Sequence, residues 1–188
     1  MHRIVAALLR DFVESYELHE MGEADQFERL VNHCVITPEV VESYDLADIT
    51  TTSGDDGLDG CALLIDQEVS LSIEDAEEIL GDGRRNHDVK LILTQAKTSE
   101  NLDLGEVLKF HAAIERFCHD FKDTPNDSIE ANTKQVYGAA IDRAGAIRDG
   151  KLSLLIRFAY TGRYIAPEEI EKAKAELVNR IEEEGYFS

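Results

Sequence analysis

Three polar residues that could act together on a phosphate group lie at the ends of predicted strands. Asp59 precedes the apolar stretch GCALLID, and Gln95 and Lys97 end the stretch DVKLILTQAK. Side chains alternate across a strand, so Gln95 and Lys97 share one face, and Asp59 shares a face with Cys61. Because α/β sheets commonly present functional groups at the carboxyl ends of their strands, we expect Asp59, Gln95 and Lys97 to converge.

These side chains offer the donors of a divalent-metal site. Asp59 supplies the hard oxygen that Mg²⁺ or Mn²⁺ prefers, Gln95 a neutral carbonyl oxygen, and Ala96 its backbone carbonyl as a further ligand. Lys97 could orient and acidify an attacking water and neutralise charge that develops on a phosphate. The set predicts metal-dependent hydrolysis of a phosphodiester bond, with Asp59, Gln95 and Lys97 as catalytic residues.

A predicted helix over residues 23–35 offers a fourth group. Glu28 lies at the edge of its apolar stripe, from which a carboxylate can reach the sheet, whereas Arg29 points away. Glu28 is therefore a candidate metal ligand and catalytic residue, and a solvated surface glutamate is an equally good interpretation. The stripe consists of Phe27, Leu30, Val31 and Cys34.

The positions of apolar residues predict the elements that must hold this site. The predicted helices span 2–20, 23–35, 73–81, 103–122, 127–149 and 167–184. A strand hairpin starts at Leu58 and turns near Asp66 and Gln67, and further strands cover 88–97 and LSLLIRFAYTG. The near-continuous apolar character of both later strands predicts burial, with 88–97 in the centre of the sheet. This order predicts an α/β layered fold with a central mixed sheet flanked by helices.

Simpler interpretations of the same residues stay open. Asp59 lies beside glycines and could bind the backbone of its own turn. Asp55 and Asp56 are typical turn residues, although Asp56 could join the metal site. Lys97 could be a solvated strand terminus. His111 falls on the apolar stripe of its helix and is expected to be a core histidine with a hydrogen-bond partner, not a catalytic one.

The cysteines and apolar segments exclude several protein classes. Three cysteines without CxxC spacing argue against a disulfide framework or a structural zinc site and predict buried free thiols. The apolar runs are too short to span a membrane. An N-terminal run that resembles a signal peptide is broken by Arg10, Asp11 and Glu14, so a cytoplasmic protein is expected. The cysteines are Cys34, Cys61 and Cys118.

The negative net charge of the chain argues against binding of nucleic acid. The 188 residues include 39 acidic and 19 basic ones, which gives a net charge of −20. The first 60 residues hold 14 acidic and three basic side chains. Such a field repels phosphate backbones, yet it favours a divalent cation. The second hypothesis is therefore a domain that binds a basic partner or mediates dimerisation.

The segments GDDGLDGCALLI, QAKTS and DLGEVLKF resemble the nuclease domain at the N-terminus of abortive-infection phage-resistance (AIPR) proteins. More broadly they resemble the Mrr-like restriction endonucleases of the PD-(D/E)XK superfamily. In that group the metal-binding Asp lies in a G-(I/L)-D-G strand start, and Q-x-K replaces E-x-K. Asp59, Gln95 and Lys97 match these positions, and Glu28 in FERL resembles the helix Glu found upstream. The resemblance covers roughly residues 20–160.

This resemblance implies a restriction-endonuclease-like fold and a Mg²⁺- or Mn²⁺-dependent DNA endonuclease of phage defence. DNA is favoured over RNA, no membrane is involved, and the protein could form a homodimer. One nuclease-like domain would span 1–188, with its core at about 20–165 and a C-terminal helix over 166–188. Because phage-resistance relatives are longer, the chain is either an N-terminal domain of such a protein or a short relative. The alternative is a catalytically weak nuclease-fold module, for binding or dimerisation, of a larger defence protein.

Overall fold

The strands form one mixed sheet in the order β2-β1-β3-β4. β1 (Gly60–Ile65) pairs antiparallel with β2 (Glu68–Val69) and β3 (Val89–Lys97), and β3 pairs in parallel with β4 (Ser153–Tyr160). The computed structural model describes residues 1–51, 57–119 and 128–188. The turn between β1 and β2 lies at Asp66 and Gln67, as predicted, and both have left-handed φ values of 51° and 71°.

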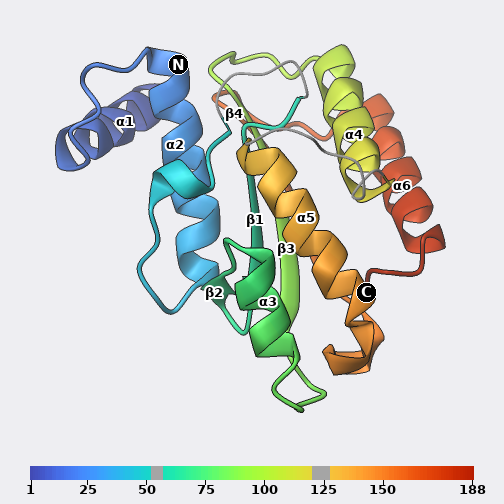
Figure 1. The fold of residues 1–188 in the computed structure, drawn as a ribbon. Coiled ribbons are helices and arrows are strands. Elements are labelled where there is room, and N and C mark those ends of the chain that lie inside the picture. The colour runs from blue at the N-terminus through green and yellow to red at the C-terminus, as the bar shows by residue number, and fades with distance from the viewer. Residues whose placement is uncertain (52–56, 120–127) are drawn as a thin grey trace.

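Helices cover both faces of the sheet (Figure 1). The long helices are α1 (Arg3–Ser15), α2 (Glu23–Ile36), α3 (Ile73–Leu80), α4 (Leu104–His119), α5 (Ile129–Asp142) and α6 (Glu168–Glu183). Short 3₁₀ turns occupy Thr37–Glu39, Leu46–Asp48, Ala144–Ala146 and Arg148–Gly150. α1 and α2 lie on one side of the sheet, and α3, α4, α5 and α6 lie on the other.

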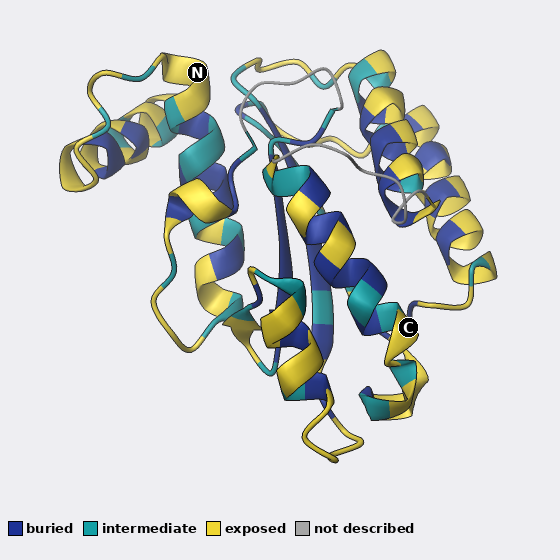
Figure 2. Cartoon of the chain, in the orientation of Figure 1, coloured by how far each residue is buried: buried dark blue, intermediate teal, exposed yellow. Residues whose placement is uncertain are grey.

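The alternation of side chains divides the interior into two hydrophobic clusters. Ala62, Leu64 and Ile92 point into the cluster shared with α1 and α2, whereas Leu63 and Leu91 point into the cluster shared with α3 to α6. β1 is buried along its whole length, and β3 is buried except at its two lysines (Figure 2). The prediction of a central strand buried on both faces is therefore confirmed for β3.

β4 was predicted to be buried, and this prediction is wrong. Its residues are partly or fully exposed, with Ser153 and Arg157 the most open. The reason is its place in the sheet, since β3 pairs with one side of β4 and no described residue pairs with the other. Apolar composition alone cannot distinguish such an edge strand from a central one.

Two predicted helices are shorter than expected. α1 ends at Ser15, and Glu17 beyond it has a left-handed φ of 55°. α5 ends at Asp142, and the following 3₁₀ turns include Asp149 with a left-handed φ of 58°. Residues 120–122, predicted to end the fourth helix, lie outside the described residues.

All three cysteines are free, and two of them are buried as predicted, namely Cys61 and Cys118. Cys34 is exposed, which corrects the prediction. The row of α2 that faces the sheet includes Asn32 and Ile36, so Cys34 lies to one side of it and points to solvent.

The mixed α/β class and the sheet flanked by helices are confirmed. In the described ranges, no helix has the length and apolar character needed to cross a membrane.

Candidate functional site

Asp59 is fixed to the last residues of β3 by two hydrogen bonds. Its backbone N–H donates to the carbonyl of Thr94 at 2.9 Å, and its carboxylate Oδ2 accepts from the N–H of Ala96 at 2.7 Å. The two bonds lie on either side of Gln95. In a strand, the N–H and C=O of one residue point toward the same neighbouring strand. Because the Ala96 N–H points to Asp59, the Ala96 carbonyl also points toward the chain that carries Asp59. Asp59 thus binds the neighbouring strand and not only its own turn.

A buried amide from α2 sets the position of Asp59. Asn32 is fully buried, and its Nδ2 donates to the backbone carbonyl of Asp59 at 2.9 Å and to Thr50 Oγ1 at 3.1 Å. Its Oδ1 accepts from the Thr94 hydroxyl at 2.5 Å. A Cβ on Gly60 would lie 2.3 Å from Asn32 Oδ1, so the residue after Asp59 must be glycine for this contact to form.

Glu28 lies on the same helical row as Asn32 and Ile36, since residues four apart stack on one face of a helix. Both of these residues are fully buried, so the row points toward the sheet and not to the edge of the stripe. Burial, and then repulsion from Asp59 and Asp25, raise the pKa of Glu28 to about 7. The neighbourhood of Asp59 therefore destabilises a negative charge on Glu28.

Lys97 places a positive charge near the carboxylates of Asp59 and Glu106. Its Nζ lies 4.0 Å from Glu106 Oε2, and Lys109 Nζ lies 2.8 Å from the other oxygen of Glu106. Burial raises the pKa of Asp59, the hydrogen bond from Ala96 and the charge of Lys97 lower it, and Glu106 raises it. Lys97 thus interacts electrostatically with Glu28 of α2, Asp59 before β1 and Glu106 of α4, which disfavours a simple solvated strand end.

Glu106 is a residue that the sequence prediction missed. It lies in the first turn of α4, within the DLGEVLKF segment. The segment was recognisable as an acidic-apolar helix, but nothing in its spacing places this carboxylate beside Lys97. The crossover from β3 to α4 brings the two together.

Gln95 is buried in the face of β3 that points toward α4 and α5. Only 3% of its surface is exposed, and its Oε1 has no hydrogen-bond partner in the part of the chain that the structure describes. Buried amide oxygens are almost always paired, because an unpaired one loses its water without compensation. Gln95 therefore has an oxygen available for a further ligand, although it makes no hydrogen bond to Asp59 or Lys97.

Several features of these residues fit a divalent cation. Asp59 and Glu28 are carboxylates whose charged forms are disfavoured, and Gln95 adds an unpaired oxygen on the face of β3 opposite to α2. Among residues 1–51, 57–119 and 128–188, no three His, Cys, Asp or Glu side chains group closely enough to hold a metal. Any site must then combine two carboxylates with neutral oxygens. Asp55 and Asp56 lie outside the described residues.

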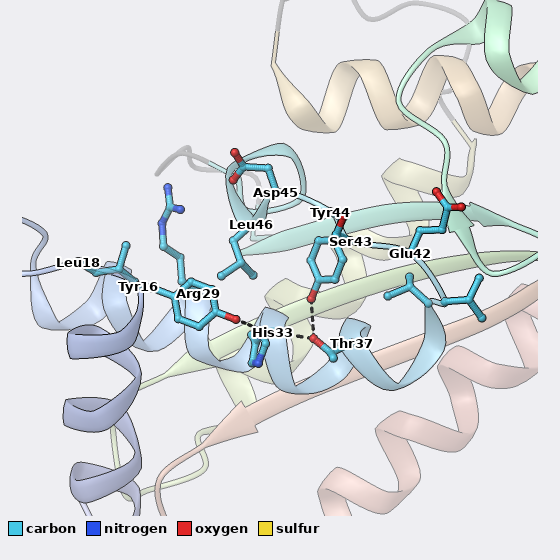
Figure 3. Close-up of a pocket in the computed structure, with 12 residues that line it drawn as sticks. Tyr16, Leu18, Arg29, His33, Thr37, Glu42, Ser43, Tyr44, Asp45 and Leu46 are labelled. Carbon is cyan, nitrogen blue, oxygen red and sulfur yellow. Dashed lines mark hydrogen bonds between the residues drawn. The ribbon is translucent and has the colours of Figure 1, made fainter.

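A separate cavity of about 810 Å³ lies beside α2, and its lining includes none of these site residues. Figure 3 shows Tyr16, Thr37 and Tyr44 around His33, with Arg29 standing apart from them. Hydrogen bonds join Tyr16 and Thr37 to His33 Nδ1 at 3.3 and 3.2 Å, and Thr37 to Tyr44 at 2.8 Å. Arg29 is partly buried and lines this cavity, which is separate from the candidate site.

Comparison with known proteins assigns no family. No protein-family model, no curated protein and no solved structure matches this chain.

Proposed function

We propose that this protein is a metal-dependent phosphodiesterase, most simply a DNA endonuclease, with its site at the end of the sheet where β1 begins and β3 ends. The observation that carries the proposal is that Asp59 and Glu28 repel each other and that both are stabilised electrostatically by Lys97. Both carboxylates are partly buried with raised pKa values, as expected where a cation is meant to bind.

In this proposal Asp59 and Glu28 would hold Mg²⁺ or Mn²⁺, and Gln95 Oε1 and the Ala96 carbonyl would supply neutral oxygens. The bound cation would supply Lewis acidity toward the scissile phosphate. Lys97 orients the attacking water and offsets charge that develops on the phosphate oxygens. Glu106 holds the ammonium group of Lys97 near Asp59, so we assign it as a positioning residue.

The order of elements supports a restriction-endonuclease-like fold. The helix that carries Glu28 is followed by a hairpin that starts just after Asp59 and by the short helix α3. The central strand that ends in Gln95 and Lys97 comes next, and the helices α4 and α5 then lead to a parallel strand. This is the arrangement implied by the resemblance to Mrr-like nucleases. A cytoplasmic role in phage defence follows from that resemblance alone.

The second candidate function is a binding or dimerisation module with the same fold. Its support is the net charge of −20, which opposes capture of a nucleic acid. A basic partner, or a further domain that grips DNA, would reconcile this charge with the site. If a further domain supplies the contacts with DNA, this chain alone would cleave and bind DNA weakly.

A cleavage assay on labelled double-stranded DNA, single-stranded DNA and RNA tests the proposal. Each substrate is incubated with Mn²⁺ or Mg²⁺ at about 5 mM, which saturates sites of millimolar affinity, and with EDTA as the metal-free control. We expect metal-dependent cleavage that Asp59→Asn abolishes. The matched control is Asp88→Asn, an exposed carboxylate paired with Arg148 at 3.0 Å. Equal activity of Asp59→Asn and the parent protein would refute the assignment. If neither the parent protein nor any variant binds metal, the second candidate function, a binding or dimerisation module, would be favoured.

A further inference from the structure

A second cavity, distinct from the proposed nuclease site, lies between β4 and the helices α4 and α6. It measures about 440 Å³, within the range of roughly 300–1,000 Å³ that is typical of small-molecule sites. α4 and α6 lie side by side on this face of the sheet (Figure 1). Most of the lining is apolar, with Phe110 and Phe158 packed edge to face at 5.7 Å. Asp59, Glu28, Gln95 and Lys97 do not contribute to it.

The charged residues of this cavity are all basic, in a chain with a net charge of −20. Arg157 and Lys174 line it, and no described Asp or Glu does. Arg157 donates to the carbonyl of Ile156 at 3.0 Å, and no carboxylate of the described residues lies within 4.0 Å of its guanidinium. Lys174 lies 5.5 Å above the ring of Tyr164 and pairs with Glu171 at 3.0 Å. Arg157 therefore has a charge that no described carboxylate neutralises.

The lining also contains a buried polar atom without a partner. His111 is 5% exposed, and its Nδ1 makes no hydrogen bond within the described ranges. This corrects the expectation of a core histidine with its hydrogen bonds satisfied. Burial, and then the charge of Arg180, lower the pKa of His111, whereas Glu115 raises it, so the ring is neutral at pH 7. A neutral imidazole without a partner can bind one polar atom of a ligand.

We propose that this cavity binds a small organic acid with an apolar body. The apolar lining would bury the body, Lys174 would pair with the acid group, and His111 Nδ1 would meet a polar atom. Arg157 alternates to the other face of β4 from Ile156 and Phe158, and it would reach the acid group around the edge of this strand. A second copy of the chain is a poorer occupant, because two chains of −20 repel and a symmetric β4 contact would bring two copies of Arg157 together. The site does not depend on nuclease activity.

The proposal is tested by titrating the full chain with decanoate, decyl phosphate and decanol and measuring binding from the NMR shifts of its backbone amides. We expect saturable binding of an acid, with shifts at Phe110, His111 and Ile156 and weaker binding of decanol. Arg157→Gln should weaken acid binding about tenfold by removing a charge-assisted contact. Lys151→Gln, which changes an exposed cation outside the cavity, is its control. Preference for decanoate or for decyl phosphate identifies the acid group.

A second pair of variants tests the location. Val178 lines the cavity and is 49% exposed, so Val178→Trp fills the space without disturbing the core. This variant should lose acid binding, whereas Asn179→Trp, at an exposed neighbour outside the lining, should keep it. The proposal is overturned if neither acid binds saturably, if decanol binds as tightly as both acids, or if Val178→Trp binds like the parent. A parent dimer that Val178→Trp dissociates would also overturn it, since the cavity would then be a subunit interface.

Discussion

The side chain of Asn32 occupies the space that a side chain on Gly60 would need. A Cβ at Gly60 would approach Asn32 Oδ1 to 2.3 Å and Nδ2 to 2.5 Å. Hydrogen bonds to Thr50, Asp59 and Thr94 hold the amide, so it cannot turn aside. This contact fixes α2, and with it Glu28, against the strand start that carries Asp59.

The first prediction concerns this pair of residues. Gly60→Ala should lower the free energy of unfolding by about 1–3 kcal/mol through overpacking. Asn32→Ala should lower it by about 2 kcal/mol, because buried hydrogen-bond partners are left unpaired. In the double variant, the loss of unfolding free energy should be smaller than the sum of the two single losses by at least about 1 kcal/mol. The reason is that removal of the Asn32 side chain makes room for the new methyl group. Urea unfolding measures all three, and strict additivity would contradict the contact.

The second prediction is a pH dependence set by Glu28. Its pKa is about 7 in the folded protein against an ordinary value of 4.5, so protonation favours the folded state. This contribution is complete below about pH 4.5 and is lost as the pH rises to about 7. In EDTA, Glu28→Gln should therefore gain stability relative to the parent as the pH rises from 5 to 8. Because Glu28 is only half-buried, solvent screening reduces the expected gain to about 1 kcal/mol.

Thermal unfolding at several pH values measures this difference. Glu23→Gln, which alters an exposed carboxylate in the first turn of the same helix, is the control. A Glu28→Gln effect that is the same at pH 5 and pH 8, or that is matched by Glu23→Gln, would show that Glu28 is an ordinary surface residue.

The third prediction links metal binding to proton release. At pH 7 Glu28 is about half protonated, so binding of Mn²⁺ should release about half a proton per ion. Calorimetry in two buffers of different ionisation enthalpy measures this number. Glu28→Gln should bind Mn²⁺ more weakly and release fewer protons, and Asp59→Asn should not bind it. Binding that is unaffected in both variants would place the ion elsewhere.

The fourth prediction separates Lys97 from its neighbour. Lys97→Ala should lower nuclease turnover at least about 100-fold, as expected for a group that stabilises developing charge, and should leave the melting temperature nearly unchanged. Lys109→Ala should change turnover by less than about threefold, although Lys109 is the closer partner of Glu106. Single-turnover cleavage with metal in excess compares the two. Equal losses would mean that Lys97 acts only through Glu106.

The fifth prediction uses the thiols to test the packing. Burial raises the pKa of all three thiols, to about 12 for Cys61 and Cys118, but only Cys34 is exposed to a reagent. A thiol reagent should therefore modify one cysteine quickly in the folded protein and three in denaturant. Cys34→Ser should remove the fast reaction. Two or more fast thiols in the folded parent would contradict the burial of Cys61 or Cys118.

The sequence determined the local features of this protein. Period-two and helical patterns located the helices, the hairpin turn at Asp66 and Gln67, and the central strand, because these patterns depend on neighbours along the chain. They also singled out Asp59, Gln95 and Lys97 by residue type at strand ends. The exposed edge of β4 escaped prediction, because edge position depends on pairing and not on composition.

The tertiary structure alone decided which distant groups meet. Packing of α2 against the sheet turned the row of Glu28, Asn32 and Ile36 inward and left Cys34 in solvent. The crossover after β3 brought Glu106 to Lys97, and the place of α6 beside β4 created a cavity around His111 with basic residues at its wall. These contacts join segments far apart in the chain, and they depend on how whole elements pack, which no local pattern encodes.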